Sequence, residues 1–85
     1  MKQRRVHAAA DDDPLNALSE REKEVLIHIG RGHTNHQIAE KLFISENTVK
    51  KHVNSIYAKI ETDNRAGAAA FAWRRGLIDE EAGDA

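Results

Sequence analysis

The chain has 85 residues, 40% of them hydrophobic, which suffices for one small domain with a modest core and leaves no room for a second domain. The lack of cysteine excludes disulfides and thiolate zinc sites, and no apolar run approaches the roughly 18 residues of a membrane span. Met1 to Ala10 also lack the apolar centre of a signal peptide, so we expect a soluble, cytoplasmic protein without a membrane partner.

Residues 1–17 mix a basic cluster, three alanines, an acidic run and the only proline, without helical periodicity. We interpret this segment as a disordered arm or an interdomain linker. The basic cluster at Lys2, Arg4 and Arg5 can touch DNA, although a solvated tail is the simpler interpretation. Residues 79–85 are expected to form an acidic disordered tail.

The first two helices are predicted from their capping residues. Ser19 and Glu22 form a capping box that begins the first helix, and Gly30 and Gly32 are expected to end it. A second capping box at Thr34 begins the second helix. The residues predicted to be buried in these two helices are Val25, Leu26, Ile29, Ile38, Ala39 and Leu42.

A short turn should join the second helix to the third. Phe43 and Ile44 lie in this turn, where we expect them to fix the angle between the two helices. Ser45 is a suitable N-cap for a third helix of about residues 46–60. At about 100° per residue, one face of this helix is apolar and consists of Val49, Val53, Ile56 and Ile60.

The fourth predicted helix is capped by Asp63 or Asn64 and ends at Gly76, spanning about residues 64–75. One of its stripes consists of Ala66, Ala69, Ala70 and Trp73. Because this short helix is apolar on more than one side, we expect it to contribute to a dimer contact. The residues predicted for that interface are Ala68, Phe71 and Arg75. The complete prediction is an all-α, four-helix bundle that contains a helix-turn-helix.

Polar side chains occupy the outward face of the third helix. The net charge of −1 gives no indication of a nucleic-acid partner, but residues 34–60 are net positive. Lysine can donate to guanine and asparagine can pair with adenine in the major groove. Our candidates for base reading are Lys50, Lys51, Asn54 and Asn47. A simple solvated helix face remains the alternative.

Phosphate contacts are expected at the starts of the second and third helices, where backbone amides point outward. The candidates are Thr34, Asn35, Ser45, Thr48 and Lys59; the hydroxyl residues among them can also serve simply as N-caps. His28, His33 and His36 suggest a metal site, but no further ligand completes it, so we expect neither metal nor cofactor. No nucleophile elbow or phosphate loop occurs, and we therefore expect no enzymatic activity.

The sequence resembles the LuxR/NarL-type DNA-binding effector domain from about Leu18 to Leu77. The residues that carry this resemblance are Leu18-Ser19-Glu20-Arg21-Glu22-Lys23-Glu24-Val25-Leu26, Gly32, Asn35, Ile38-Ala39, Leu42, Ile44-Ser45-Glu46, Thr48-Val49-Lys50, His52, Lys59 and Arg65. The resemblance implies that the third helix enters the major groove and that the fourth helix mediates dimerisation. It also implies a role in transcription, often as the output half of a two-component response regulator.

One departure from the family pattern follows the third helix, where Glu61 and Thr62 replace the usual glycine and aliphatic residue. Glycine adopts the left-handed C-cap conformation at little cost and glutamate does not, so we expect a looser or differently terminated helix end.

Sequence-specific binding of double-stranded DNA as a homodimer is the resulting functional prediction, and a contact with RNA polymerase is left open. Two alternatives remain: a sigma-factor-like promoter reader, and a protein-interaction module that does not bind DNA. The sequence leaves open whether the chain is a free-standing regulator or the output domain of a longer one.

Overall fold

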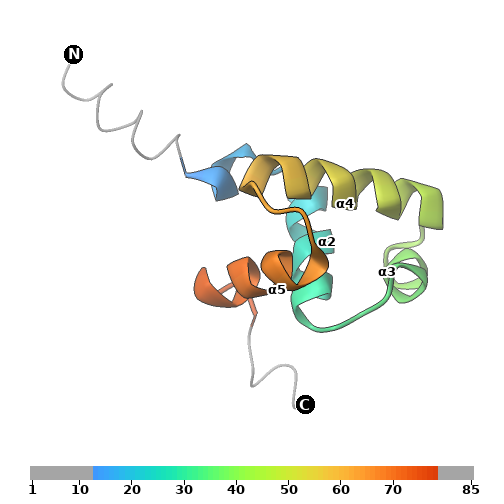
Figure 1. Ribbon diagram of the computed structural model, residues 1–85. Helices are drawn as coiled ribbons and strands as arrows, with labels where there is room; N and C mark the ends of the chain where they lie inside the picture. Colours follow the sequence, from blue (N-terminus) through green and yellow to red (C-terminus); the bar gives the residue numbers. More distant parts are fainter. Residues whose placement is uncertain (1–12, 79–85) are drawn as a thin grey trace.

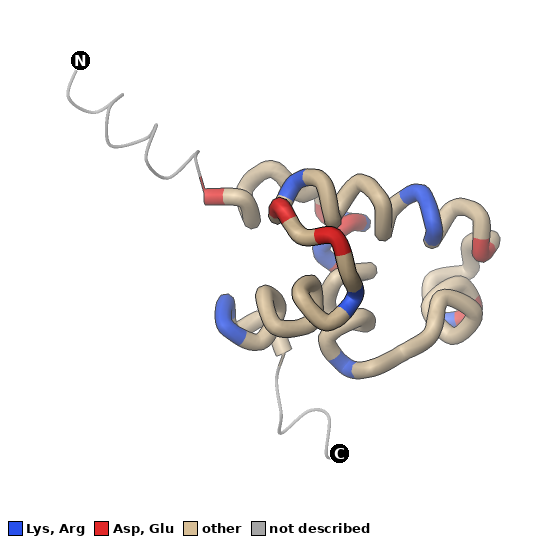
Figure 2. Tube along the Cα trace, in the orientation of Figure 1, with Lys and Arg blue, Asp and Glu red and all other residues tan. Residues whose placement is uncertain are grey.

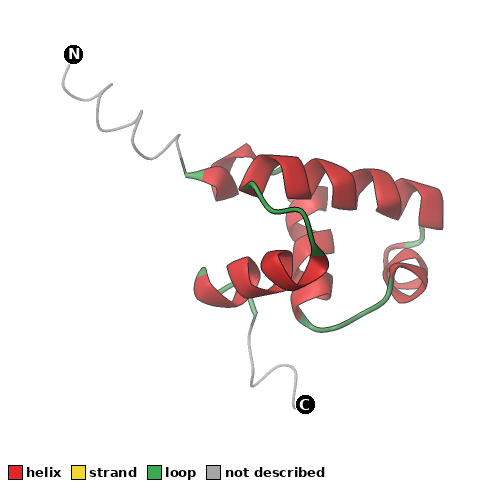
Figure 3. Ribbon diagram, viewed as in Figure 1, coloured by secondary structure: helices red, strands yellow, loops and turns green. Residues whose placement is uncertain are grey.

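The computed structural model describes residues 13–78, and all the regular structure in this range is helical (Figures 1 and 3). The four predicted helices are all present, preceded by a short 3-10 helix, so the prediction of an all-α, four-helix fold is confirmed. The elements are η1 (Pro14–Ala17), α2 (Glu20–Gly30), α3 (Asn35–Leu42), α4 (Glu46–Ile60) and α5 (Arg65–Arg74).

Side chains cap the first turn of each α-helix, as the sequence predicts. At α2, the Glu22 amide donates to Ser19 Oγ at 3.1 Å and the Ser19 amide donates to Glu22 Oε1 at 2.9 Å. Thr34 and Gln37 form the same reciprocal pair at α3. These bonds satisfy amides that have no partner inside the helix, which explains why the helices begin at these residues.

The N-caps of α4 and α5 each use a single side chain. Ser45 Oγ accepts from the Thr48 amide at 3.0 Å, and Asn64 Oδ1 accepts from the Gly67 amide at 2.7 Å. Asn64, and not Asp63, is therefore the cap of α5.

Helix α2 lies at the centre of the fold and packs against both α4 and α5, while α3 packs against α4 (Figure 1). The apolar stripes of all four helices meet in one core. Its buried residues are Leu18, Val25, Leu26, Ile29, Ile38, Ala39, Val49, Val53, Ile56, Ile60, Ala68, Phe71 and Ala72. The apolar spacing read from the sequence thus predicts most of this core, since each stripe faces the other helices.

Helices α2 and α5 approach each other closely at Gly30, which is the last residue of α2. A Cβ atom at Gly30 would lie 2.6 Å from Ile78 Cδ1 and 3.1 Å from Ala72 Cβ. Trp73 Nε1 donates to the Gly30 carbonyl oxygen at 2.9 Å. Glycine is therefore needed here for packing, whereas Gly32, with φ of 85°, makes the turn that follows the helix.

The ordered domain begins earlier than residue 18, because Pro14–Ala17 form η1. Leu15 packs against the core, and Asp13 forms an ion pair with Arg75 just after α5. The predicted arm therefore contains an ordered turn in its last residues. The other predictions for this arm and for the acidic tail concern residues 1–12 and 79–85, which lie outside the described part of the chain.

Two residues other than glycine adopt left-handed backbone conformations within residues 13–78: Phe43, with φ of 59°, and Glu61, with φ of 61°. The side chain of Phe43 is 92% exposed, so the prediction that it fixes the angle between the helices is wrong; Ile44 alone packs against the core. At Glu61, the Thr62 amide still donates to the Tyr57 carbonyl oxygen at 3.0 Å. Helix α4 ends as it would with glycine, so the predicted departure in helix termination is also wrong.

Candidate nucleic-acid interface

The outward face of α4 carries the four residues predicted to read bases, and all four are exposed. They lie opposite Val49, Val53 and Ile56, which are buried in the core. Burial of the apolar stripe therefore fixes the rotation of α4 and leaves the polar stripe facing solvent. The four exposed residues, which we call the α4 face, are Asn47, Lys50, Lys51 and Asn54.

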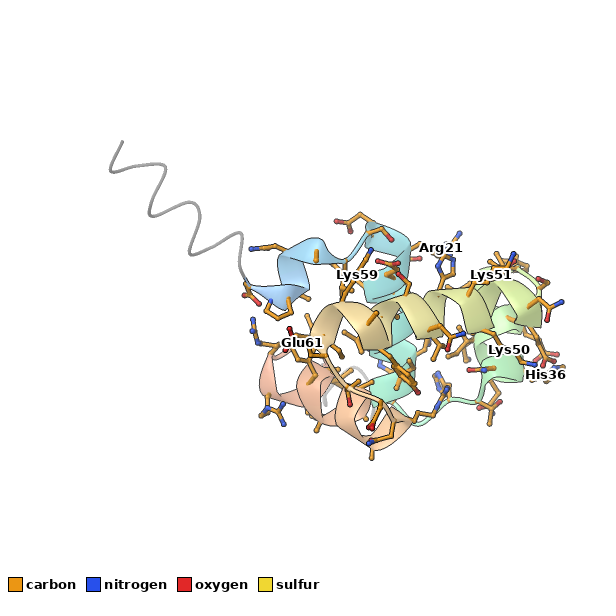
Figure 4. The ribbon with its side chains drawn as sticks, turned by 45° about the horizontal axis from the view of Figure 1, so that its top comes forward. Arg21, His36, Lys50, Lys51, Lys59 and Glu61 are labelled. Atoms are coloured by element: carbon orange, nitrogen blue, oxygen red, sulfur yellow. The ribbon has the colours of Figure 1, made fainter. Side chains whose placement is uncertain are left out.

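The charge of the α4 face comes from two adjacent lysines near the start of the helix (Figures 2 and 4). Within residues 13–78, the ion pairs involve neither Lys50 nor Lys51. Both ammonium groups can therefore meet an external anion without breaking an internal ion pair. Asn47 and Asn54 flank them and add amide donors and acceptors.

The predicted phosphate-binding residues at the two helix starts already form hydrogen bonds within the domain, some as helix caps and some with other side chains. Thr34 and Ser45 cap α3 and α4, and Ser45 Oγ also donates to Thr48 Oγ1 at 2.9 Å. Asn35 Oδ1 accepts from Arg65 Nη1 at 3.0 Å. Each helix start thus keeps an outward end with polar side chains, of the kind that binds phosphate oxygens.

Arg65 is a structural link that the sequence reasoning did not assign. Besides Asn35, it binds the His33 carbonyl oxygen through Nη2 at 2.8 Å. These two bonds join the first residue of α5 to the segment that leads into α3. Arg65 therefore helps to hold the helix-turn-helix in place against the rest of the domain.

Lys59 has a different role from the predicted phosphate contact. Its Nζ lies 2.9 Å from Oε1 of Glu22, a residue that is only 6% exposed. Burial by itself would raise the pKa of Glu22, but hydrogen bonds from Ser55, Lys59 and the Ser19 amide outweigh it and lower this pKa to about 2. Lys59 therefore fastens α4 to α2, and the structure gives no support for it as a phosphate ligand.

The predicted dimer residues are also placed differently. Ala68 is fully buried and Phe71 is 8% exposed, so both belong to the core, and the prediction that they form a dimer contact is wrong. Arg75 pairs with Asp13 and lies over the Phe71 ring, with Cζ 5.0 Å from the ring centroid. Helical spacing places an apolar stripe on several sides of α5, and only packing decides which side is buried.

The three histidines considered for a metal site, His28, His33 and His36, lie in two separate places. His28 Nδ1 and His33 Nδ1 lie 3.0 Å apart, and burial, together with nearby positive charge, lowers the pKa of both imidazoles. His36 instead lies between Glu46 and Glu40, and the hydrogen bond to Glu46 raises its pKa. Within residues 13–78, no group of three or more His, Asp or Glu side chains is arranged to hold a metal ion.

No helix between residues 13 and 78 combines the length and the apolar character of a membrane span. The exposed polar surface of the domain includes α4, the second helix of a turn-linked pair. This arrangement, with α4 outward and α3 behind its start, is a helix-turn-helix.

Comparison with known proteins agrees with this geometry. Residues 16–72 match the family described as bacterial regulatory proteins, luxR family. The chain is 38% identical to the transcriptional regulatory protein LiaR of Bacillus subtilis over 73 residues, which make up 86% of the chain and 35% of LiaR. It is 42% identical to the DNA-binding transcriptional activator DevR/DosR of Mycobacterium tuberculosis over 65 residues, 76% of the chain and 30% of that protein.

A third relative, the oxygen regulatory protein NreC of Staphylococcus haemolyticus, is 38% identical over 77 residues. The match includes 86% of the chain and 36% of NreC, so the chain spans about a third of the length of such relatives. The family match includes all four α-helices except the last residues of α5. The chain therefore belongs to the luxR family of bacterial regulatory proteins, as the resemblance implied.

Proposed function

We propose that this chain binds double-stranded DNA sequence-specifically in the cytoplasm, with the first half of α4 in the major groove, and so regulates transcription. DNA binding in transcription regulation follows from membership of the luxR family. The finer assignment of the groove-binding helix rests on one observation. The α4 face is exposed, carries two lysines that form no ion pair with another residue between 13 and 78, and lies on the second helix of a helix-turn-helix.

The chemistry of the α4 face suits base edges in the major groove. A lysine ammonium can donate to guanine O6 and N7, and an asparagine amide can pair with adenine N6 and N7. Asn47, Lys50, Lys51 and Asn54 recur at spacings of three and four residues, so they form one strip along about two turns of α4. We therefore propose these four residues as the base-reading set.

Phosphate contacts at the groove edges would fix the position of α4. The starts of α3 and α4 each offer backbone amides and hydroxyl or amide side chains for this purpose. We propose Thr34, Asn35, Ser45 and Thr48 as phosphate ligands. Their capping bonds leave further acceptor and donor capacity, since a hydroxyl oxygen can take part in more than one hydrogen bond.

The proposed homodimer would use the side of α5 on which Ala66 and Trp73 are exposed and Ala69 and Ala70 are partly buried. Trp73 is 43% exposed, and Ala66 is exposed about two turns earlier on the same side of the helix. Small side chains allow two helices to approach closely, and an indole adds apolar area. Two copies joined in this way would present two α4 faces to two half-sites about one turn of DNA apart. A contact with RNA polymerase is part of the same proposal.

The relatives that match are about three times longer than the aligned segment, and their names describe regulators. We propose that this domain provides the DNA-binding output of a two-component response regulator of that kind. Its role as activator or repressor depends on where its operator lies.

Selection of bound duplexes from a random library tests the proposed function, followed by measurement of affinity against salt. A DNA reader should enrich one motif and lose affinity with a log-log slope of about −0.9 for each phosphate neutralised. A domain that only binds other proteins through α5 should enrich no motif. A sigma-factor-like reader should bind its site well only in the presence of RNA polymerase.

A further inference from the structure

His36 joins the two helices of the helix-turn-helix through two carboxylates. Its Nδ1 lies 2.7 Å from Glu46 Oε2, and its Nε2 lies 3.3 Å from Glu40 Oε2. Glu40 follows His36 by one turn on α3, whereas Glu46 is the first residue of α4. One imidazole thus contacts a carboxylate on each helix, and all three side chains are at least half exposed.

This cluster lies next to the proposed DNA-binding surface. Glu46 precedes Lys50 by one helical turn, and Figure 4 shows His36 and Lys50 at the same end of the molecule, where α4 begins. Two carboxylates at this position would repel DNA phosphates. A protonated imidazole between them would offset that repulsion, because it removes one unit of negative charge from the cluster.

We propose that protonated His36 strengthens DNA binding by offsetting one of the two negative charges of Glu40 and Glu46 beside the α4 face, so that DNA affinity falls as this imidazole loses its proton. The inference rests on the proposed position of α4 in the major groove. His36 would act through the charge of its two partners, and is in this sense a positioning residue for the DNA contact.

The electrostatic surroundings of His36 support the sign of the effect. On α3 the charged group that faces it is Glu40, and on α4 it is Glu46; the hydrogen bond to Glu46 and the charge of both raise the pKa of His36 above its usual value near 6.5. The remaining charged or titratable residues of these helices are Lys41, Lys50, Lys51, His52, Tyr57 and Lys59. Lysines keep their charge near neutral pH, so His36 is the group in this cluster that changes.

Bound DNA should raise the pKa of His36 further, because phosphates stabilise the imidazolium. By linkage, each unit by which DNA raises this pKa corresponds to a tenfold difference in affinity between the protonated and neutral forms. We expect a roughly three- to tenfold loss of affinity between about pH 6 and about pH 8 as the imidazole loses its proton.

Two substitutions can fix the two charge states. His36→Gln keeps a polar side chain without charge, and His36→Lys keeps a positive charge at both pH values. The probe is the duplex most enriched in the library selection, and a scrambled duplex of equal length measures non-specific binding. The dissociation constant is measured at about pH 6 and about pH 8 with constant ionic strength, which removes changes in screening.

The wild type should bind about three- to tenfold more tightly at the lower pH. His36→Gln should bind weakly at both pH values, and His36→Lys should bind tightly at both. His33→Gln is the matched control: it removes an imidazole outside the contact of α3 with α4 and should keep the wild-type pH dependence. Circular dichroism of each variant checks that all remain folded at both pH values.

A His36→Gln variant that binds tightly and keeps the wild-type pH dependence would overturn this inference alone. Loss of the pH dependence in His33→Gln would also overturn this inference, because it would assign the effect to the pair of His28 and His33. If the wild type enriches no duplex at either pH, the proposed base-reading function fails first and this inference falls with it.

Discussion

Glu22 of α2 and Lys59 of α4 form an ion pair of 2.9 Å in which the carboxylate is almost completely buried. Ser55 Oγ donates to Glu22 Oε2 at 2.6 Å. The Ser19 amide donates to Glu22 Oε1, the oxygen that Lys59 also binds, at 2.9 Å. One side chain therefore caps α2 and also attaches the proposed recognition helix to it. This network attaches the second half of α4 to α2, while the α4 face stays exposed.

Stability should depend on pH through Glu22. Its pKa is about 2 in the folded domain and near 4.5 when unperturbed, so its contribution is complete above pH 4.5 and is lost as the pH falls toward 2. The contribution is on the order of 3 kcal/mol. Urea unfolding at about pH 7 and at about pH 3 should show a loss of about 2 kcal/mol, since the folded-state pKa lies below pH 3, and Glu22→Gln should remove most of this loss. Equal acid sensitivity in both proteins would contradict the assignment.

Lys59→Ala and Lys50→Ala should have different consequences. Lys59→Ala leaves a buried carboxylate without its cation and should lower the free energy of unfolding by about 1–3 kcal/mol. Well below its melting temperature, the folded variant should retain its DNA affinity. Lys50→Ala should keep the wild-type stability and weaken binding to the selected duplex, with less discrimination against mismatched duplexes. Denaturant titrations and binding isotherms on both variants measure these effects; the reverse pattern would be inconsistent with the two roles.

Glycine should stabilise the domain at both left-handed positions. Phe43 and Glu61 have positive φ, which is unfavourable for residues with a Cβ atom, and Phe43 loses little packing because it is 92% exposed. Phe43→Gly and Glu61→Gly should each raise the free energy of unfolding by about 0.5–1 kcal/mol. Ala58→Gly, at an exposed position within α4, is the control and should lower it by about 1 kcal/mol. A loss at positions 43 and 61 as large as at 58 would refute this account.

The two sides of α5 should separate folding from dimerisation. Phe71→Ala should cost about 3 kcal/mol of stability because it empties a core position. Ala66→Glu adds charge to an exposed position and should leave stability nearly unchanged. If α5 forms the homodimer, Ala66→Glu should prevent two copies from binding one duplex with two half-sites. Sedimentation of the complexes would reveal this, and unchanged two-to-one complexes would argue against a dimer through α5.

The helix starts were well predicted from the sequence, because the residues that determine them lie within a few positions of each start. Ser19, Thr34 and Ser45 each cap a helix within a few residues of their own position, and apolar spacing located the core stripes. Left-handed caps at Phe43 and Glu61 were harder to predict, since these residues adopt a conformation that their own preferences disfavour, while the following amides of Ile44 and Thr62 close the helix ends by hydrogen bonds.

Contacts between distant residues could not be predicted from spacing. Arg65 reaches Asn35 across thirty positions of the chain, and Lys59 reaches Glu22 across thirty-seven. The sequence identified Lys59 as a cation but could not show that a buried carboxylate faces it. Similarly, Ala68 lies on an apolar helix whose buried side depends on how α5 packs against α2. The exposed α4 face was predictable because its apolar opposite side was unambiguous.

Amide chemical-shift mapping of the folded chain with the selected duplex shows directly whether α4 reads DNA. We expect the largest shifts at Asn47, Lys50, Lys51 and Asn54, with smaller shifts at the starts of α3 and α4 and little change around Glu22 and Lys59. Large shifts confined to α5, with the α4 face unaffected, would contradict the claim that α4 reads DNA.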